Sequence, residues 1–257
     1  MILRRLTTNL RTQNWTTIAI ELCIVIIGVF VGNMVSNWNQ ARIAKETTAR
    51  MLEQLKLELD GEIDYFASIR RYYQITGRYA DVALARWDKD PRVTDEQFVT
   101  AAYQASQVYG VGINGQNWTL VFGGDQLRNI EDPTLRRHLG SVLTTDYTNV
   151  GLATMQTRYR DDVRLVIPND IQTRIRARCG DRLVSDAADQ HIYVLPAACA
   201  LHLDPAEAAA AGRNLRAHPA IAGELALHLG SAKAYLQNVD IIEAAIEALK
   251  RDLDQRT

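Results

Sequence analysis

One apolar stretch near the amino terminus limits what this chain can fold into more than any other feature. Residues 18–35 contain only two strongly polar side chains, Glu21 and Asn33. An apolar segment of about 18 residues or more is long enough to cross the hydrocarbon core of a bilayer as a helix. Trp15 and Trp38 flank the stretch, and tryptophan concentrates at the two membrane interfaces. The pattern predicts a membrane-spanning helix.

A cleaved signal peptide is the alternative interpretation of this stretch. Its apolar core is normally about 7 to 15 residues long and ends at a small-x-small site, whereas here a longer run leads into Ser36 and Asn37. The sequence therefore favours an uncleaved anchor. We expect a cytoplasmic basic tail over residues 1–15, a transmembrane helix over 16–38 and a folded periplasmic domain over 39–257.

The cysteines decide the expected orientation, because Lys and Arg are similarly frequent on the two sides of the helix. Cys23 lies in the span, so Cys179 and Cys199 are the only pair left for the large domain, which is compatible with an oxidising compartment. We predict a bacterial inner-membrane protein with its large domain in the periplasm and a Cys179–Cys199 disulfide. A zinc site made of both cysteines with His191 and His202, or two free thiols, are the alternatives.

The single glutamate in the apolar stretch shares a helix face with small residues. Glu21, Gly28 and Gly32 fall on one stripe of an α-helix, which Ser36 extends. Small residues four apart let two helix backbones approach closely in lipid, and intramembrane carboxylates usually face protein or water. These four residues are thus predicted to form a helix-association face of a homo-oligomer. Otherwise Glu21 is protonated, or snorkels through a thinned leaflet, and the glycines are coincidental.

A family resemblance rests on this helix and on one later block. Glu21, the two glycines and the box Asn37-Trp38-Asn39 resemble the start of a family of uncharacterised single-pass bacterial membrane proteins. Residues 118–135, which read WTLVFGGDQLRNIEDPTL, are similar to a second motif of that family. Ser36 and Phe122 depart from its pattern. The resemblance implies an interface box at Asn37, Trp38 and Asn39 and a single membrane span, but it implies no chemistry.

Beyond the membrane, the spacing of apolar residues predicts a mainly α domain, a helical bundle that continues the membrane helix. Three-four spacing over residues 52–73 predicts a long amphipathic helix. Thr94 to Gln97 form a predicted capping box, and Asp132-Pro133 predicts the start of a helix that runs to about Val166. Residues 170–203 are expected to be irregular and clipped by the cysteines, and the β-like run at residues 191–195 suggests a hairpin or a clipped loop.

The carboxyl-terminal segment gives the clearest helical pattern. After Pro219, nine residues keep a heptad rhythm that only His228 interrupts: Ile221, Leu225, Ala232, Tyr235, Val239, Ile242, Ile246, Leu249 and Leu253. This stripe predicts a helix that packs on residues 52–73 within the bundle. A coiled coil between protomers is the second interpretation.

Composition and motifs narrow the function classes. The chain has 30 acidic and 29 basic residues, which argues against a nucleic-acid partner because such proteins usually carry a basic excess. Common phosphate-binding, zinc-protease and serine-hydrolase motifs are absent from the sequence, and Asp161-Asp162 is interpreted as a solvated helix face beside Arg158, Arg160 and Arg164. We expect a protein that is not an enzyme and has no cofactor or metal.

The leading hypothesis is an oligomeric scaffold or accessory subunit of an envelope complex, with the lipid bilayer, further copies of itself and a possible multi-pass membrane protein as partners. A periplasmic ligand-sensing bundle is the first alternative, and it predicts a pocket lined by Tyr72, Tyr73, Tyr103 and Tyr109. An ion-coupled transport or motor accessory subunit that uses Glu21 is the second.

Overall fold

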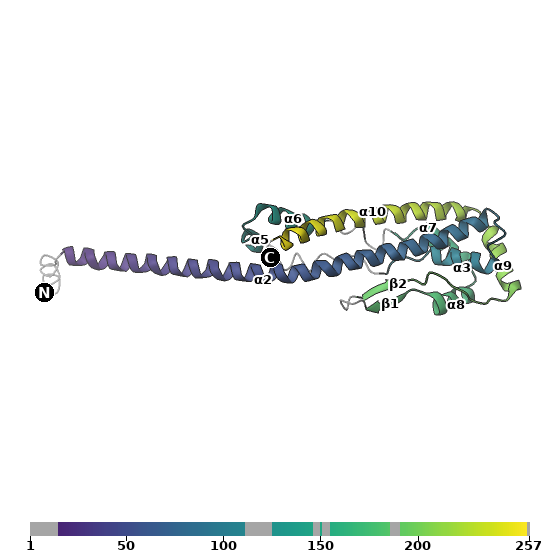
Figure 1. The fold of residues 1–257 in the computed structure, drawn as a ribbon, viewed down its shortest axis with the longest axis horizontal. Coiled ribbons are helices and arrows are strands. Elements are labelled where there is room, and N and C mark those ends of the chain that lie inside the picture. Colours follow the sequence, from purple (N-terminus) through teal and green to yellow (C-terminus); the bar gives the residue numbers. More distant parts are fainter. Residues whose placement is uncertain (1–14, 111–124, 146–149, 151–154, 186–190, 256–257) are drawn as a thin grey trace, which may run out of the picture. The chain divides into compact units, whose positions relative to one another are not determined.

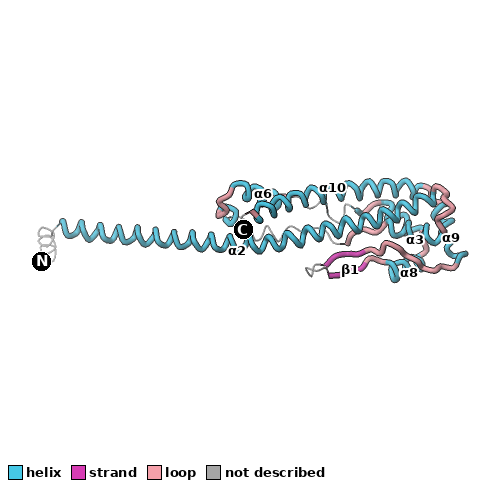
Figure 2. The backbone as a smooth tube through the Cα atoms, in the orientation of Figure 1, coloured by secondary structure: helices cyan, strands magenta, loops and turns pink. Residues whose placement is uncertain are grey.

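The computed structural model describes residues 15–110, 125–145, 150, 155–185 and 191–255. These form a mainly helical chain with a long apolar N-terminal helix and one small hairpin (Figures 1 and 2). The helices are α2 (Trp15–Trp87), α3 (Asp95–Ala105), α5 (Asp125–Arg128), α6 (Pro133–Leu143), α7 (Arg158–Val166), α8 (Asn169–Cys179), α9 (Pro205–Arg216) and α10 (Ala220–Asp254), and the strands are β1 (Arg182–Ser185) and β2 (His191–Val194). The chain divides into two compact units, Met1–Met51 and Leu52–Thr257, and the helix α2 contributes to both.

In the first unit, the part of α2 from Ile20 to Trp38 exposes apolar side chains around the helix. The large apolar side chains between Ile20 and Trp38 are exposed, and none of this hydrophobic window is buried in the described structure. The helix is long and apolar enough to cross a membrane, as a span or as a signal sequence. The predicted long apolar helix is therefore confirmed.

In the second unit, the remainder of α2 and the helix α10 run antiparallel (Figure 1). Tyr73 packs on Tyr235, with ring centroids 5.2 Å apart. Toward the other end of the pair, Lys56 Nζ lies 2.6 Å from Asp254 Oδ1. The two contacts show that α2 and α10 run in opposite directions, with Tyr73 level with Tyr235 and Lys56 level with Asp254. This arrangement supports the predicted bundle.

The buried face of α10 is the predicted stripe, completed by one histidine. All nine apolar residues of the heptad pattern are buried, and so is His228. The prediction that His228 interrupts the stripe was wrong. Its ring stacks near Tyr159, with centroids 5.4 Å apart, and its Nδ1 lies 2.6 Å from the hydroxyl of Thr157, so an aromatic contact and a hydrogen bond satisfy it inside the core.

The helices α3 and α9 close one end of this unit. Thr94 and Gln97 form the predicted capping box of α3. Asp95, in the first turn, accepts hydrogen bonds from Arg86 at 3.1 Å and from Arg216 of α9 at 2.7 Å. A Cβ at Gly212 would lie 2.8 Å from the Asp95 carboxylate, so a larger residue there would force this carboxylate, and its hydrogen bonds to the two arginines, to shift.

The predicted end of the helix that begins after Asp132 was wrong. Asp132 caps a helix with Pro133 in its first turn, as expected, but that helix ends at Leu143 and the next described helix, α7, begins at Arg158. The hydroxyls of Thr144 and Thr145 hydrogen-bond to the carbonyls of Gly140 and Ser141, and such side chains compete with continuation of a helix.

The segment 170–203 is also more regular than predicted, because α8 occupies its first third. Ile171, Ile175 and Cys179 lie four residues apart and are buried on one face of α8, a period hidden among arginines. The expected hairpin follows, with β1 and β2 antiparallel and Leu183 paired with Tyr193.

Candidate functional sites

The predicted association face lies on a described, regular stretch of α2. Glu21, Gly28, Gly32 and Ser36 fall within this one helix, so their spacing places them along one side. No heavy atom lies within 4 Å of a Cβ built on Gly28 or Gly32. In the first unit, the groove above the two glycines is thus unoccupied by other side chains of the described chain.

The residues of the interface box make only local contacts in the described structure. Trp38 is exposed, and the amide oxygen of Asn39 accepts a hydrogen bond from Arg42 at 3.4 Å. Gln40 donates to the hydroxyl of Ser36 at 3.4 Å. Such contacts along one helix do not hold another element, so Asn37, Trp38 and Asn39 remain predicted to act at an interface.

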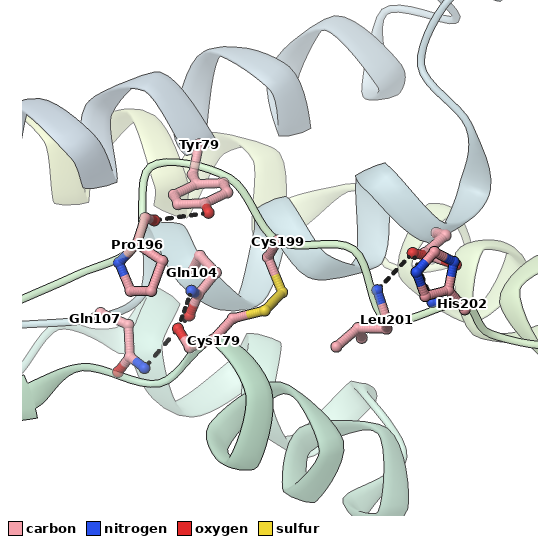
Figure 3. The surroundings of a disulfide bond; sticks show 9 residues. Tyr79, Gln104, Gln107, Cys179, Pro196, Cys199, Leu201 and His202 are labelled. Carbon is pink, nitrogen blue, oxygen red and sulfur yellow. Dashed lines mark hydrogen bonds between the residues drawn. A yellow bond between two sulfur atoms is a disulfide. The ribbon is translucent and has the colours of Figure 1, made fainter.

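The two cysteines of the second unit are joined. A disulfide links Cys179, the last residue of α8, to Cys199 in the segment after β2, with Cα atoms 5.6 Å apart (Figure 3). This separation lies within the range usual for disulfides and agrees with the predicted pairing. Because both thiols are used, they are not free to complete a zinc site with His191 and His202, and no group of three or more metal-binding side chains occurs among the described residues.

Hydrogen bonds from α2 and α3 fix the segment that the disulfide clips. The amide of Gln104 donates to the carbonyl of Cys179 at 2.7 Å, and the Tyr79 hydroxyl donates to the carbonyl of Pro196 at 2.9 Å (Figure 3). Glu96 accepts from the backbone N–H groups of Leu201 and Leu203, each at 2.8 Å. Burial opposes ionisation of Glu96, but these donors outweigh it and hold its pKa below the usual range.

The tyrosines that were predicted to line a ligand pocket instead pack on one another or on other core side chains. Tyr72, Tyr73, Tyr103 and Tyr109 are all buried. The ring of Tyr109 meets that of Tyr72 edge to face at 5.3 Å, and its hydroxyl lies 2.7 Å from that of Ser68. Burial raises the pKa of Tyr72 and of Tyr73. The cavity beside Tyr72 holds only about 20 Å³, the size of one water molecule, so these rings form a core.

A cavity much larger than the one beside Tyr72 lies elsewhere in the second unit, between α7, the end of α9 and the start of α10. It has a volume of about 800 Å³ and is bounded by Arg158, Asp162 and Leu165 of α7 and by Glu224 of α10, among others. A second cavity of about 230 Å³ reaches His228 and also contacts Arg158 and Glu224. We call the two together the α7/α10 cleft.

Two carboxyl groups and one arginine occupy the centre of this cleft. The Nε of Arg158 lies 3.3 Å from Asp162 Oδ2 and 3.5 Å from Glu224 Oε1. Burial, followed by the charge of the adjacent Asp162 carboxylate and a hydrogen bond shared with it, raises the pKa of Glu224. The Oε2 of Glu224 is buried and accepts from no N–H donor within the described ranges.

This arrangement corrects part of the interpretation of Asp161-Asp162 as a solvated face beside three arginines, because Asp161 is exposed and Arg158 pairs with Asp162 but the other two arginines contact a different element. Arg160 donates to the carbonyl of Ser106 at 2.6 Å, and Arg164 donates to the amide oxygen of Gln107 at 2.9 Å. Both arginines therefore secure α7 to the end of α3, and Asp162 turns toward the cleft. Sequence reasoning missed this site because its parts lie on helices far apart in the chain.

No protein-family model, curated protein or solved structure matches this chain. The resemblance to a family of single-pass bacterial membrane proteins therefore stays a prediction.

Proposed function

We propose that this chain is a single-pass bacterial inner-membrane protein that self-associates through its apolar helix and serves as a non-enzymatic scaffold or accessory subunit of an envelope complex. The observation that carries the proposal is the exposure of apolar side chains on every face of α2 between Ile20 and Trp38. Exposing this much apolar surface to water is unfavourable, whereas lipid and partner helices solvate it.

The small residues on that helix support self-association. Open space lies above Gly28 and Gly32, and in lipid a second helix gains van der Waals contact by packing closely against such a groove. Glu21 on the same side supports this, because a carboxyl group in hydrocarbon is stabilised by a polar partner. The disulfide of the second unit is compatible with a periplasmic location for that unit.

The test compares two enlargements of side chains on opposite sides of the helix. Gly28→Leu inserts a side chain at the predicted closest approach and is expected to reduce the cross-linked oligomer of the full chain in native membranes. Cys23→Leu, on the roughly opposite face and also exposed, is the matched control and should leave the oligomer unchanged.

Equal oligomer distributions for wild type and Gly28→Leu would refute the association face. The orientation is tested separately, with a reporter that is active only in the periplasm fused after Thr257. Activity of that fusion is expected, and activity of a cytoplasmic reporter at the same position would contradict the localisation.

A further inference from the structure

The α7/α10 cleft has the dimensions of a small-molecule site. Its larger cavity measures about 800 Å³, inside the range of about 300 to 1,000 Å³ that is typical of ligand pockets. Three separate helices bound it, so its shape depends on the tertiary fold. The smaller cavity of about 230 Å³ adjoins it at Glu224, which places this carboxyl group where both cavities meet.

The charges in the cleft favour a positively charged ligand. Two carboxyl groups, Asp162 and Glu224, face one cation, Arg158. The Arg158 side chain is 82% exposed, and ion pairs made by such exposed side chains are weak. Arg158 is therefore easily displaced from Glu224, whose second oxygen is buried and accepts from no N–H donor in the described structure. The neighbour of Glu224 is instead the Asp162 carboxyl group, and two adjacent carboxyl groups repel each other when both are ionised, so a ligand that brings a positively charged N–H donor between them is stabilised.

The rest of the lining favours an apolar body attached to that cation. Leu165 is 84% exposed and borders the larger cavity beside Ile221. Leu227 is 74% exposed and borders the smaller one. Leucines so exposed at the rim of a cavity offer apolar surface that a ligand covers, with a gain from the hydrophobic effect. The acidic centre and the apolar rim together describe an amphiphilic recognition surface.

We propose that the α7/α10 cleft binds a small organic ammonium ion, a protonated primary amine on an apolar body, with the amine donating to Glu224 and Asp162 and the apolar part lying against Leu165 and Ile221. In this complex the ligand replaces Arg158 as the partner of Glu224. The site is independent of the proposed self-association, because all of its residues belong to the second unit.

The experiment uses three water-soluble probes that differ only in their polar end: 2-phenylethylamine, 2-phenylethanol and 3-phenylpropanoate. Binding to the full chain in lipid nanodiscs is measured by calorimetry, with empty nanodiscs as the blank. The amine is expected to bind at least about tenfold more tightly than the alcohol, since hydrogen bonds to charged groups exceed neutral ones by that much. The carboxylate is expected not to bind.

Four variants make the outcome specific to the cleft. Glu224→Gln should weaken amine binding at least about tenfold, and Leu165→Ala should weaken it by a smaller factor. Arg158→Gln should strengthen it, because the variant removes the competing cation. Asp161→Asn is the matched control: it removes the same charge from the exposed neighbour of Asp162 and should leave binding unchanged.

The proposal is overturned if the three probes bind equally, if only the carboxylate binds, or if none binds in the millimolar range. An amine affinity that Asp161→Asn lowers as much as Glu224→Gln would also overturn it, because a general charge effect would then explain binding. Leu165 and Arg158 are exposed, so their variants should fold normally, and they decide the question even if Glu224→Gln lowers stability.

Discussion

Two regions of the helix α2 differ in how they distribute their apolar side chains. In residues 20–38 these side chains surround the helix and are exposed, and Phe30 is 73% exposed. In residues 52–87 they recur at three-four spacing, and Leu59, Phe66 and Ile69 are fully buried. The chain continues as one helix through both regions, so secondary structure does not distinguish them.

The difference shows that the environment of a helix depends on how much of its circumference carries apolar side chains. A stripe can be buried by neighbouring elements of the same chain, as Tyr109 and Tyr235 cover tyrosines of the second region. Apolar residues on every side need an apolar environment all around, which a bilayer supplies. The two regions also differ in a polar side chain: Glu21 is predicted to need a partner from outside the chain, whereas Glu96 finds its donors within the second unit.

Truncating one phenylalanine in each region should give the largest contrast. Phe66→Ala is expected to lower the free energy of unfolding of the second unit by about 3 to 5 kcal/mol, through lost burial and the cavity left behind. Phe30→Ala, in the exposed region, should leave it unchanged. Urea unfolding of the full chain, followed by near-ultraviolet circular dichroism of the tyrosine core, measures both. If both variants lowered the free energy of unfolding equally, the first region would be packed inside the domain, and the proposed difference between the two regions would be refuted.

The structure of a region could be predicted from the sequence when the residues that determine it lie close together in the chain. The buried face of α10 was predicted fully apart from His228, because a long helix repeats its burial pattern every three or four residues. The helix α8 was missed because only Ile171, Ile175 and Cys179 mark its buried face. The apolar helix and its glutamate could be predicted from one continuous run of residues, 18–35.

The α7/α10 cleft was not predictable from the sequence. Asp162 and Glu224 are 62 residues apart in the chain, and nothing local indicates that they meet. The ligand-sensing alternative placed its pocket among tyrosines that pack together in the core, because spacing along the chain identifies buried positions but does not tell a filled core from a cavity. Tertiary packing decides both.

The cysteines offer a second contrast between the regions. Replacing Cys179 and Cys199 together by alanine should destabilise the second unit by about 3 kcal/mol, the loop-entropy estimate for a bridge of this span. Cys23→Ala should change nothing, since Cys23 is unpaired in the described structure and exposed in the first unit. Urea unfolding with and without reductant measures the effect. If reductant left the wild type unaffected, or both thiols reacted in unfolded, non-reduced protein, the disulfide would be refuted.

The smallest effect expected is a dependence of stability on pH that arises from the second unit alone. Burial lowers the pKa of His228 to about 4, below the usual value of about 6.5 in an unfolded chain. The unfolded state therefore takes up a proton before the folded state does as the pH falls. The resulting stability is complete above about pH 6.5 and is lost on acidification toward pH 4, by about 2 to 3 kcal/mol.

Glu62 opposes this trend, so the wild-type curve alone does not reveal it. Burial, helped by the Glu58 carboxylate, raises the pKa of Glu62 to about 7, and the stability contributed by its protonated form is lost as the pH rises from about 4.5 to 7. The two contributions have opposite signs in nearly the same window. Glu62→Gln should therefore make stability rise with pH between 4 and 6.5, and His228→Gln should make it fall between 4.5 and 7.

The test compares the slopes of the free energy of unfolding against pH. Absolute values are not compared, because either substitution can also change packing. Urea unfolding at intervals of pH gives the slope for each variant, and the double variant should be flatter than either single one. Glu21→Gln, in the first unit, should leave the slope of the wild type unchanged. If Glu21→Gln altered it, the glutamate would be coupled to folding of the second unit, and the two regions of α2 would not be energetically separate.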